Sequence, residues 1–364
     1  MMTTINPQRL IQLITAGCIL ALCACSRDTT TSLTGTNLAT TYLIEGAAQG
    51  TRYHITYVAP VNFSSTQQAA LSAAISAELA RLDKAISNYR PDSEIEQFNS
   101  QITTEPVEVS AEIVKLIEIA RSVHKASNGC YDLTIKPLFD LWGFKKNVFT
   151  PPSDEALAQT LQLVGMEKLE TLDKNHLRKK IPNLRVDLSS IGQGYSISTL
   201  AAILEAQAIT NYIVEIGGEL KARGQKPGNK PWRVALEKPL SNEQKIEKIA
   251  VFNSIEPMSM MPSGTYHHYF DADGKRYSHI LNARTGKPIT HTSASATVLN
   301  SDPTLADAWS TALLCLGSQE GIPIANAQGI AALYIDQRSD GFSEQPTQPL
   351  INLSTVSFEN AKGD

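Results

Sequence analysis

The sequence has little excess of charge of either sign. Its 32 Lys and Arg residues are balanced by 36 Asp and Glu residues, which gives a formal net charge of -4 and an isoelectric point near 6.0. A chain of this charge has no broad basic surface for a polyanion, so a nucleic acid is not an expected partner. At 364 residues the chain can still bury a sizeable core, in one large domain or in two average ones.

Cysteine is scarce, and its spacing excludes the common zinc sites. The five cysteines include no CxxC pair and no cluster with histidine at zinc spacing. Three of them lie in the N-terminal segment, which leaves Cys130 and Cys315. An oxidising compartment would allow a disulfide between these two. However, Cys315 falls in an apolar helical pattern, and we expect it to be a small buried hydrophobic residue instead.

The hydrophobic run at the N-terminus is short. It extends from Leu10 to Leu22, which is too few residues for a comfortable transmembrane helix but fits the hydrophobic region of a secretory signal. The run closes on Leu22-Cys23-Ala24-Cys25, which matches the lipobox of bacterial lipoproteins. We therefore expect a signal peptide at 1–24, lipidation of Cys25 and a flexible tether at 25–40. The alternative is an ordinary signal peptide with chance cysteines.

A glycine-rich stretch in the middle of the chain organises the predicted fold. Leu184 to Leu188 reads as a short buried strand, and Gly192 and Gly194 then allow a close approach of the backbone before an apolar helix. Tyr212 to Ile216 is a second core strand, followed by two further glycines. This pattern suggests a ligand crevice in an α/β protein, with Asp187 at the end of the first strand. Ordinary tight turns are the alternative explanation of the glycines.

Two charged residues lie in the otherwise apolar segment from Gly129 to Phe144. Asp132 and Lys136 are surrounded in sequence by Leu, Ile, Phe and Trp. A buried charge is costly unless another group pairs with it, so we expect both residues to have a partner. The aromatic residues of this segment, Trp142 among them, are expected to be structural.

Three histidines lie near one another in the C-terminal third. His267 and His268 would point to opposite faces of a strand, so we expect them to be exposed polar residues rather than metal ligands. His279 is different, because it ends a strand just before a polar turn. It remains an open candidate for the functional site.

A helix further along carries a candidate metal site. It begins at Asp302-Pro303, a favourable cap followed by proline at the first helical position. Asp307, Ser310 and Thr311 then share one helical face. Hard oxygen ligands in this arrangement suit magnesium or calcium. The alternative is that Asp307 caps a loop or pairs with a lysine.

An ordered series of short motifs resembles one known family. From Gly50 to about Ile335 the motifs are GTxY, SNYRPDSEIEQFN, GCYDLTIKPLFDLWGF, VDLSSIGQGYS, YIVEIGGEL, SGTYHHYF, YSHILNARTGKPI and LADAWSTAL. Each motif is weak alone, but the ordered series resembles the ApbE family, the FAD:protein FMN transferases. The resemblance implies a mixed α/β (α+β) fold of two lobes with the flavin site between them. We expect this domain at 41–352, followed by a loose tail at 353–364.

The resemblance also implies an activity and a location. Members of the family use Mg2+ to move the FMN half of FAD onto a threonine hydroxyl of a partner protein, and AMP is released. The acceptor is a flavin-carrying subunit of a membrane redox complex. Because many members are lipoproteins, the lipobox agrees with an anchor at the periplasmic side of the inner membrane. The outer membrane is the alternative.

Individual site residues follow from the matched motifs. Positions that match FAD contacts are Gln49, Ser87, Tyr89, Cys130, Tyr131, Asp132, Asp187, Gln193 and Leu281. Positions that match metal ligands are Ser190, through its backbone carbonyl, Asp307, Ser310 and Thr311. His279 matches a histidine that orients or deprotonates the acceptor hydroxyl, so His279 and Asp307 are the expected catalytic residues.

Three of these positions depart from the family pattern. Gln49 stands where many relatives have methionine, Gln193 replaces a charged residue, and Ser310 stands where relatives can have a carboxylate. The departures leave two alternatives open, an FAD pyrophosphatase that forms FMN and AMP, and a lipid-anchored FAD-binding protein without catalysis. Because Asp187 and Asp307 are retained, we expect an active transferase.

Overall fold

The computed structural model describes residues 40–144, 149, 151–237, 246–265, 269–272 and 275–360. Several expectations from the sequence lie outside the described residues, namely the signal peptide, lipidated Cys25, nearly all of the tether, and His267 and His268. Within the described ranges, no helix combines the length and the apolar character that a membrane span requires.

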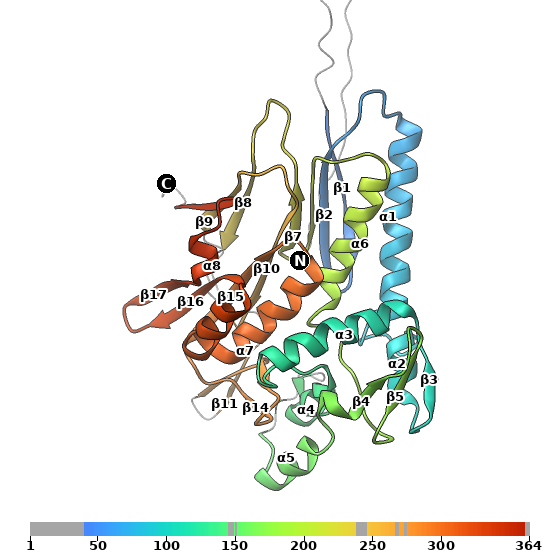
Figure 1. Ribbon diagram of the computed structural model, residues 1–364, viewed down its shortest axis with the longest axis vertical. Helices are drawn as coiled ribbons and strands as arrows, with labels where there is room; N and C mark the ends of the chain where they lie inside the picture. Colours follow the sequence, from blue (N-terminus) through green and yellow to red (C-terminus); the bar gives the residue numbers. More distant parts are fainter. Residues whose placement is uncertain are drawn as a thin grey trace, which may run out of the picture. The chain divides into compact units, whose positions relative to one another are not determined.

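An antiparallel sheet of eight strands forms the centre of the fold (Figure 1). Its order is β1 (Thr41–Ala48), β2 (Thr51–Val58), β6 (Tyr212–Ile216), β7 (Glu219–Arg223), β10 (Met258–Gly264), β15 (Ser293–Asn300), β16 (Ala331–Arg338) and β17 (Gly341–Pro346). Each neighbouring pair runs antiparallel. The sheet is therefore built from hairpins and helical crossovers, and the mixed α and β composition that the sequence predicted is confirmed.

The two faces of this sheet carry different layers. Helices α1 (Ser65–Ile86), α6 (Gly192–Ala206) and α7 (Pro303–Gln328) lie over one face, with α3 (Ala111–Ala126) packed on α7. Residues alternate along each strand, so that Met261 faces the helices while Met260 faces the opposite side. There a smaller sheet packs, in the order β18 (Val356–Asn360), β9 (Ile246–Phe252) and β8 (Trp232–Glu237).

Short elements complete the described part of the chain. The short helices are α2 (Glu94–Ser100), α4 (Lys136–Trp142), α5 (Asp154–Leu161) and α8 (Gln348–Ile351), with the one-turn helices η1 (Leu133–Ile135) and η3 (Met166–Lys168). A small sheet has the order β3 (Pro106–Glu108), β5 (His176–Lys179) and β4 (Leu169–Thr171). Two strand pairs remain, β11 (Tyr269–Ala272) with β12 (Lys275–Ser278), and β13 (Leu281–Asn282) with β14 (Lys287–Pro288).

The predicted strand from Leu184 to Leu188 is wrong in one respect. The segment is buried, but it pairs with no strand. Side-chain amides take the place of a neighbouring strand: Asn99 accepts from the Val186 amide at 2.7 Å, and Asn88 accepts from the Leu188 amide at 2.6 Å. Both asparagines also donate to the Val186 carbonyl. The buried backbone groups are thus satisfied without a sheet.

The C-terminal tail is also more ordered than expected. The sequence predicted a loose end at 353–364, but Val356–Asn360 forms β18 and pairs with β9 along Lys248–Phe252. Val356 is buried against the core of the smaller sheet, and Phe358 packs at its edge. Backbone pairing and these apolar contacts order this segment, although its polar composition predicted no regular structure.

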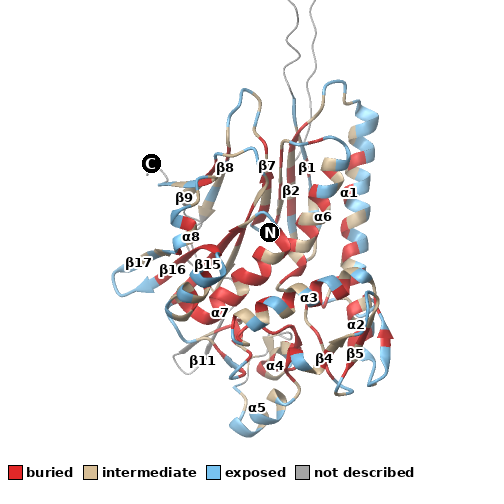
Figure 2. Ribbon diagram, in the orientation of Figure 1, coloured by how far each residue is buried: buried red, intermediate tan, exposed pale blue. Residues whose placement is uncertain are grey.

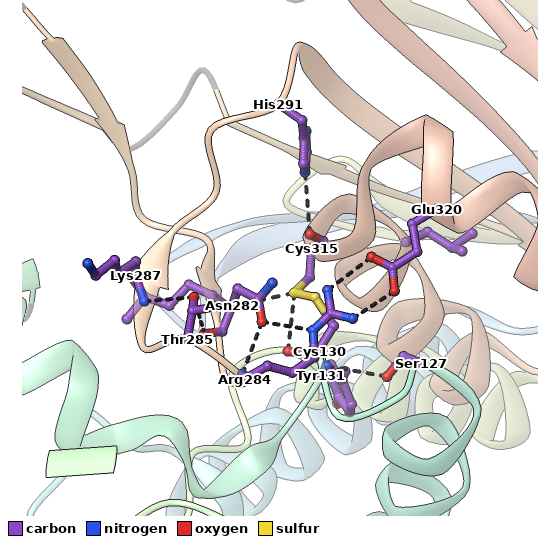
Figure 3. Close-up of a disulfide and its surroundings, with 12 residues drawn as sticks. Ser127, Cys130, Tyr131, Asn282, Arg284, Thr285, Lys287, His291, Cys315 and Glu320 are labelled. Carbon is purple, nitrogen blue, oxygen red and sulfur yellow. Dashed lines mark hydrogen bonds and ion pairs between the residues drawn. A yellow bond between two sulfur atoms is a disulfide. The ribbon is translucent and has the colours of Figure 1, made fainter. Parts of the chain in front are cut away.

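A disulfide joins Cys130 to Cys315, which corrects the expectation that Cys315 is a free buried residue. Figure 3 shows the bond between the loop after α3 and helix α7. His291 lies against the carbonyl of Cys315 at 3.3 Å, and an ion pair of 2.7 Å joins Arg284 to Glu320 nearby. The two cysteines are 185 residues apart in sequence, so only the folded chain reveals that they meet.

We expect the disulfide to stabilise the fold measurably. A cross-link over so long a loop restricts the unfolded chain, and its loss typically costs about 2–4 kcal/mol of unfolding free energy. Chemical denaturation of the Cys130→Ala/Cys315→Ala variant should show a loss of this order. A phosphine reductant should lower the melting temperature of the parent protein and leave that of the double variant unchanged. An equal response of both proteins would contradict the prediction.

Candidate active site

One pocket gathers residues from five separate parts of the chain. Its lining comes from the loop after α3, the helical segment of η1 and α4, the turn before α6, the segment at β13 and helix α7. It contains eight of the residues that the sequence singled out, namely Cys130, Tyr131, Asp132, Asp187, Ser190, His279, Leu281 and Thr311. Ile135 and Phe139 add an apolar side. A concave site with an apolar wall and a few polar groups is the usual form of a small-molecule site.

Asp132 forms part of the pocket wall, and its carboxylate is already occupied. Oδ1 accepts from the backbone and hydroxyl of Thr134 at 2.7 and 2.6 Å, and Oδ2 accepts from the Met166 amide at 3.0 Å. His124 approaches the same carboxylate at 3.4 Å. Asp132 therefore fixes the loop, and the expected partner of this buried charge is present. Lys136 likewise pairs with Glu96 at 2.7 Å.

Tyr131 lines the pocket near three carboxylates. Its hydroxyl accepts from Ser190 Oγ at 3.2 Å. Burial raises the pKa of Tyr131, and the charges of Asp307, Asp187 and Asp132 raise it further, although the Ser190 hydrogen bond acts in the opposite direction. The phenol therefore stays neutral at physiological pH. It presents a polar hydroxyl to the pocket without adding negative charge.

Asp307 is fixed by an unusually close contact between α6 and α7. Its Oδ2 accepts from the Gly194 amide at 2.8 Å, and the residue is buried within α7, which is red along much of its length in Figure 2. A Cβ at Gly194 would come within 2.7 Å of Asp307 Cβ and would collide with the Pro303 carbonyl. Glycine is thus required at 194, as the close approach expected from the sequence implies.

Three hydroxyl groups gather at the same turn of α7 as Asp307. Ser263 Oγ, on β10, lies 2.7 Å from Ser310 Oγ and 3.3 Å from Thr311 Oγ1, and Ser310 donates to the Asp307 carbonyl at 2.8 Å. Among the described residues, no group of three or more His, Cys, Asp or Glu side chains gathers at one point. A metal here would therefore rely on one or two carboxylates with hydroxyl or carbonyl oxygens. Such a hard-oxygen donor set fits Mg2+, which keeps several water or phosphate ligands.

Four other predicted residues lie outside the pocket lining. Gln49 is in the β1–β2 turn and donates to Ser196 Oγ at 2.6 Å, while its Oε1 is buried without a partner among the described residues. Gln193 packs on Gly217, where a Cβ would approach its Nε2 to 2.9 Å. Ser87 caps α1 and accepts from the amide of Tyr89, whose ring is largely exposed.

Two residues near Asp307 escaped the site prediction. Ser263 belongs to the motif SGTYHHYF, but nothing in its sequence context shows that it meets α7. Glu219 is buried at the start of β7, directly after Gly217-Gly218. The available signal in the sequence was an acidic residue directly after a glycine pair, at the beginning of a core strand.

Known proteins resemble most of this chain. The profile of the ApbE family matches residues 49–334. The chain belongs to the ApbE family. It is 36% identical to the FAD:protein FMN transferase of Vibrio cholerae over 83% of this chain and 89% of that protein, and 35% identical to that of Haemophilus influenzae over 94% and 97%.

Solved ApbE structures agree with the fold. The flavinyl transferase ApbE of Pseudomonas stutzeri, in its apo form, superposes with a TM-score of 0.78 at 33% identity, over 86% of this chain and 97% of that one. The flavin transferase ApbE of Vibrio cholerae gives 0.77 at 33% identity, over 86% and 99%. The predicted family, the mixed fold and the enzyme class, a transferase, are therefore confirmed.

The buried carboxylate of this ApbE protein makes its metal-free stability pH-dependent. Burial raises the pKa of Asp307 to about 7, against a partial opposing effect of the Gly194 hydrogen bond. The native state then binds more protons than the unfolded state between the unfolded pKa near 4 and about 7. Stability due to this group is therefore full at low pH and is lost as the pH rises through 7.

We expect the melting temperature in EDTA to fall between pH 5.5 and 7.5, and the fall to be smaller in Asp307→Asn. Added Mg2+ should restore the parent protein at pH 7.5. Asp340→Asn, which changes an exposed carboxylate in the turn between β16 and β17, serves as the matched control and should behave like the parent. Parallel pH curves for the parent and Asp307→Asn would show that Asp307 is not the responsible group.

Proposed function

We propose that the protein is a Mg2+-dependent FAD:protein FMN transferase. It would attach the FMN part of FAD through a phosphoester bond to a threonine of a partner protein and release AMP. The observation that carries this proposal is the buried Asp307 carboxylate, on the helical turn that also carries the hydroxyls of Ser310 and Thr311, next to a pocket that Thr311 and His279 line. The activity named for the Vibrio and Haemophilus relatives supports the same reaction.

Asp307, Ser310 and Thr311, with the backbone carbonyl of Ser190, would hold the metal ion. When bound, Mg2+ would neutralise negative charge on the pyrophosphate oxygens. The protein's own contribution is to keep the ligands in place before the nucleotide arrives. Gly194 fixes Asp307, and Ser263 fixes the hydroxyls of α7. Positioning and electrostatics dominate phosphoryl transfer, so a rigid site of this kind is suited to it.

The pocket would hold the flavin nucleotide. Tyr131, Asp187 and Leu281 line it, Cys130 and Asp132 form its wall, and Gln49, Ser87, Tyr89 and Gln193 would contact outer parts of FAD. His279 would orient the acceptor hydroxyl or take its proton. The hydroxyl oxygen then bonds to the phosphorus of FMN, the phosphoanhydride bond breaks, and AMP leaves with the bonding electrons.

A mixture of purified full-length protein in detergent, FAD, Mg2+ and a flavin-subunit domain with its acceptor threonine tests the proposal. We expect a fluorescent acceptor band with equimolar AMP, and loss of both by about 100-fold or more in EDTA or in Asp307→Ala. Asp340→Ala is the control and should retain the activity. AMP and FMN with a dark acceptor would instead identify an FAD pyrophosphatase, and bound but intact FAD would identify a carrier.

We also propose that the protein is anchored by lipid on Cys25 at the periplasmic side of the inner membrane. The hydrophobic run and the lipobox at 22–25 support this location, as does the need to reach a flavin-carrying subunit of a membrane redox complex. The transferase domain would extend from 41 to 352, with β18 as an addition.

Metabolic labelling with an alkynyl palmitate analogue checks the anchor. We expect the parent protein to be labelled and to sediment with inner membranes on a sucrose gradient. Cys25→Ser should carry no label, whereas Cys23→Ser, two residues away, should be labelled like the parent. Label retained in Cys25→Ser would refute lipidation at this cysteine, and sedimentation with the outer membrane would correct the location.

A further inference from the structure

A second carboxylate lies next to the candidate metal site and has no assigned role. Glu219 is the first residue of β7, and only 8% of it is exposed. Its Oε2 is fully buried and has no hydrogen-bond partner among the described residues. An ionisable oxygen left in this condition is costly, and native proteins rarely keep one without a ligand or another function.

The backbone brings Glu219 to the same layer as Asp307. Strand β7 pairs with β10, and the Leu220–Met260 pair leaves Glu219 one residue further along, on the strand face that bears Met261 and Ser263. That face lies under α7, since Ser263 contacts Ser310 and Thr311. The preceding turn at Gly217 packs on Gln193, the neighbour of Gly194, which in turn holds Asp307.

Glu219 and Asp307 are close enough for their negative charges to repel one another. Burial raises the pKa of Glu219 well above its usual value, and the negative charge of Asp307 raises it further. Within the described part of the chain, neither carboxylate forms an ion pair with a basic side chain. Two buried carboxylates that repel one another, with no basic side chain paired to either, would be stabilised by a divalent cation.

We propose that Glu219 belongs to the divalent-cation site and supplies it with a second carboxylate beside Asp307. This inference rests on the proposed Mg2+-dependent function and deepens it. Ser310 is neutral, so helix α7 provides one negative charge, and β7 provides the other. Ligand charge is a main determinant of the affinity of oxygen sites for divalent cations. Glu219 would act as a direct ligand or as the acceptor for a metal-bound water, and in both cases removal of its charge weakens binding.

Metal binding, measured separately from activity, tests this role. Glu219→Gln keeps the size of the side chain and removes the charge. In the full-length protein in detergent, titration with Mn2+ followed by electron paramagnetic resonance should show affinity lower by about 10- to 100-fold. The melting temperature in EDTA should be equal to or higher than that of the parent, because a buried repulsion has been relieved. Glu219→Asp should recover part of the affinity.

Glu205→Gln is the matched control. Glu205 is a half-buried carboxylate of α6 that pairs with Arg223 at 2.9 Å and accepts from the Tyr212 hydroxyl at 2.6 Å. Its variant should lose stability both with and without metal and should bind Mn2+ like the parent. A merely structural Glu219 would resemble this control, with a lower melting temperature in EDTA and unchanged affinity, and that result would overturn the inference.

Asp307→Asn separates this inference from the proposed function. If Asp307→Asn loses Mn2+ affinity while Glu219→Gln retains it within about twofold, Glu219 is not part of the site and the transferase proposal is unaffected. If both variants retain the affinity, the metal site itself is wrongly placed and both proposals fail. A tenfold loss in each variant, with Glu205→Gln unchanged, is the result that we expect.

Discussion

The contact between Gly194 and Asp307 is the constraint on which the site depends. Helices α6 and α7 approach so closely there that no side chain fits at position 194, and the free backbone amide can then donate to the buried carboxylate. This fixes α7 lengthwise against α6. Thr311, one turn beyond Asp307, consequently faces the pocket, and Ser310 meets Ser263 on β10. The packing of the helices and the geometry of the candidate metal site are therefore set by the same residues.

The other walls of the pocket are held by polar side chains rather than by a sheet. Asn88 and Asn99 satisfy the backbone on either side of Asp187, and Asp132 closes the turn that carries Tyr131. The disulfide then ties Cys130 in that turn to α7. The hydrogen bonds satisfy buried polar groups, and the disulfide restricts the loop that carries Cys130. Together they hold the backbone of these loops in place, as pairing in a sheet does for strands. The pocket can thus be built from loops and still be rigid.

Sequence reasoning succeeded where the determining interactions are local. The apolar run of β6 and the Asp302-Pro303 start of α7 depend on neighbours within a few residues, and the structure has both elements. It failed where the hydrogen-bond partners of a segment come from residues far away in the sequence. Leu184 to Leu188 has the apolar pattern of a strand, but its hydrogen-bond partners are asparagine side chains 87 to 100 residues earlier.

The same distinction applies to the site. The ordered motifs identified Asp187, His279 and Thr311, and the fold brings all three to one pocket. Glu219 lay in one of those motifs and was still missed, because only the fold brings β7 under α7 and its buried Asp307. The neutral Ser310 suggested a weak metal site for a related reason, because the sequence does not show which carboxylates lie next to it. The total charge of an oxygen site is the sum over all the helices and strands that meet there. A neutral residue in one element can therefore be interpreted only after the carboxylates on the neighbouring elements have been located.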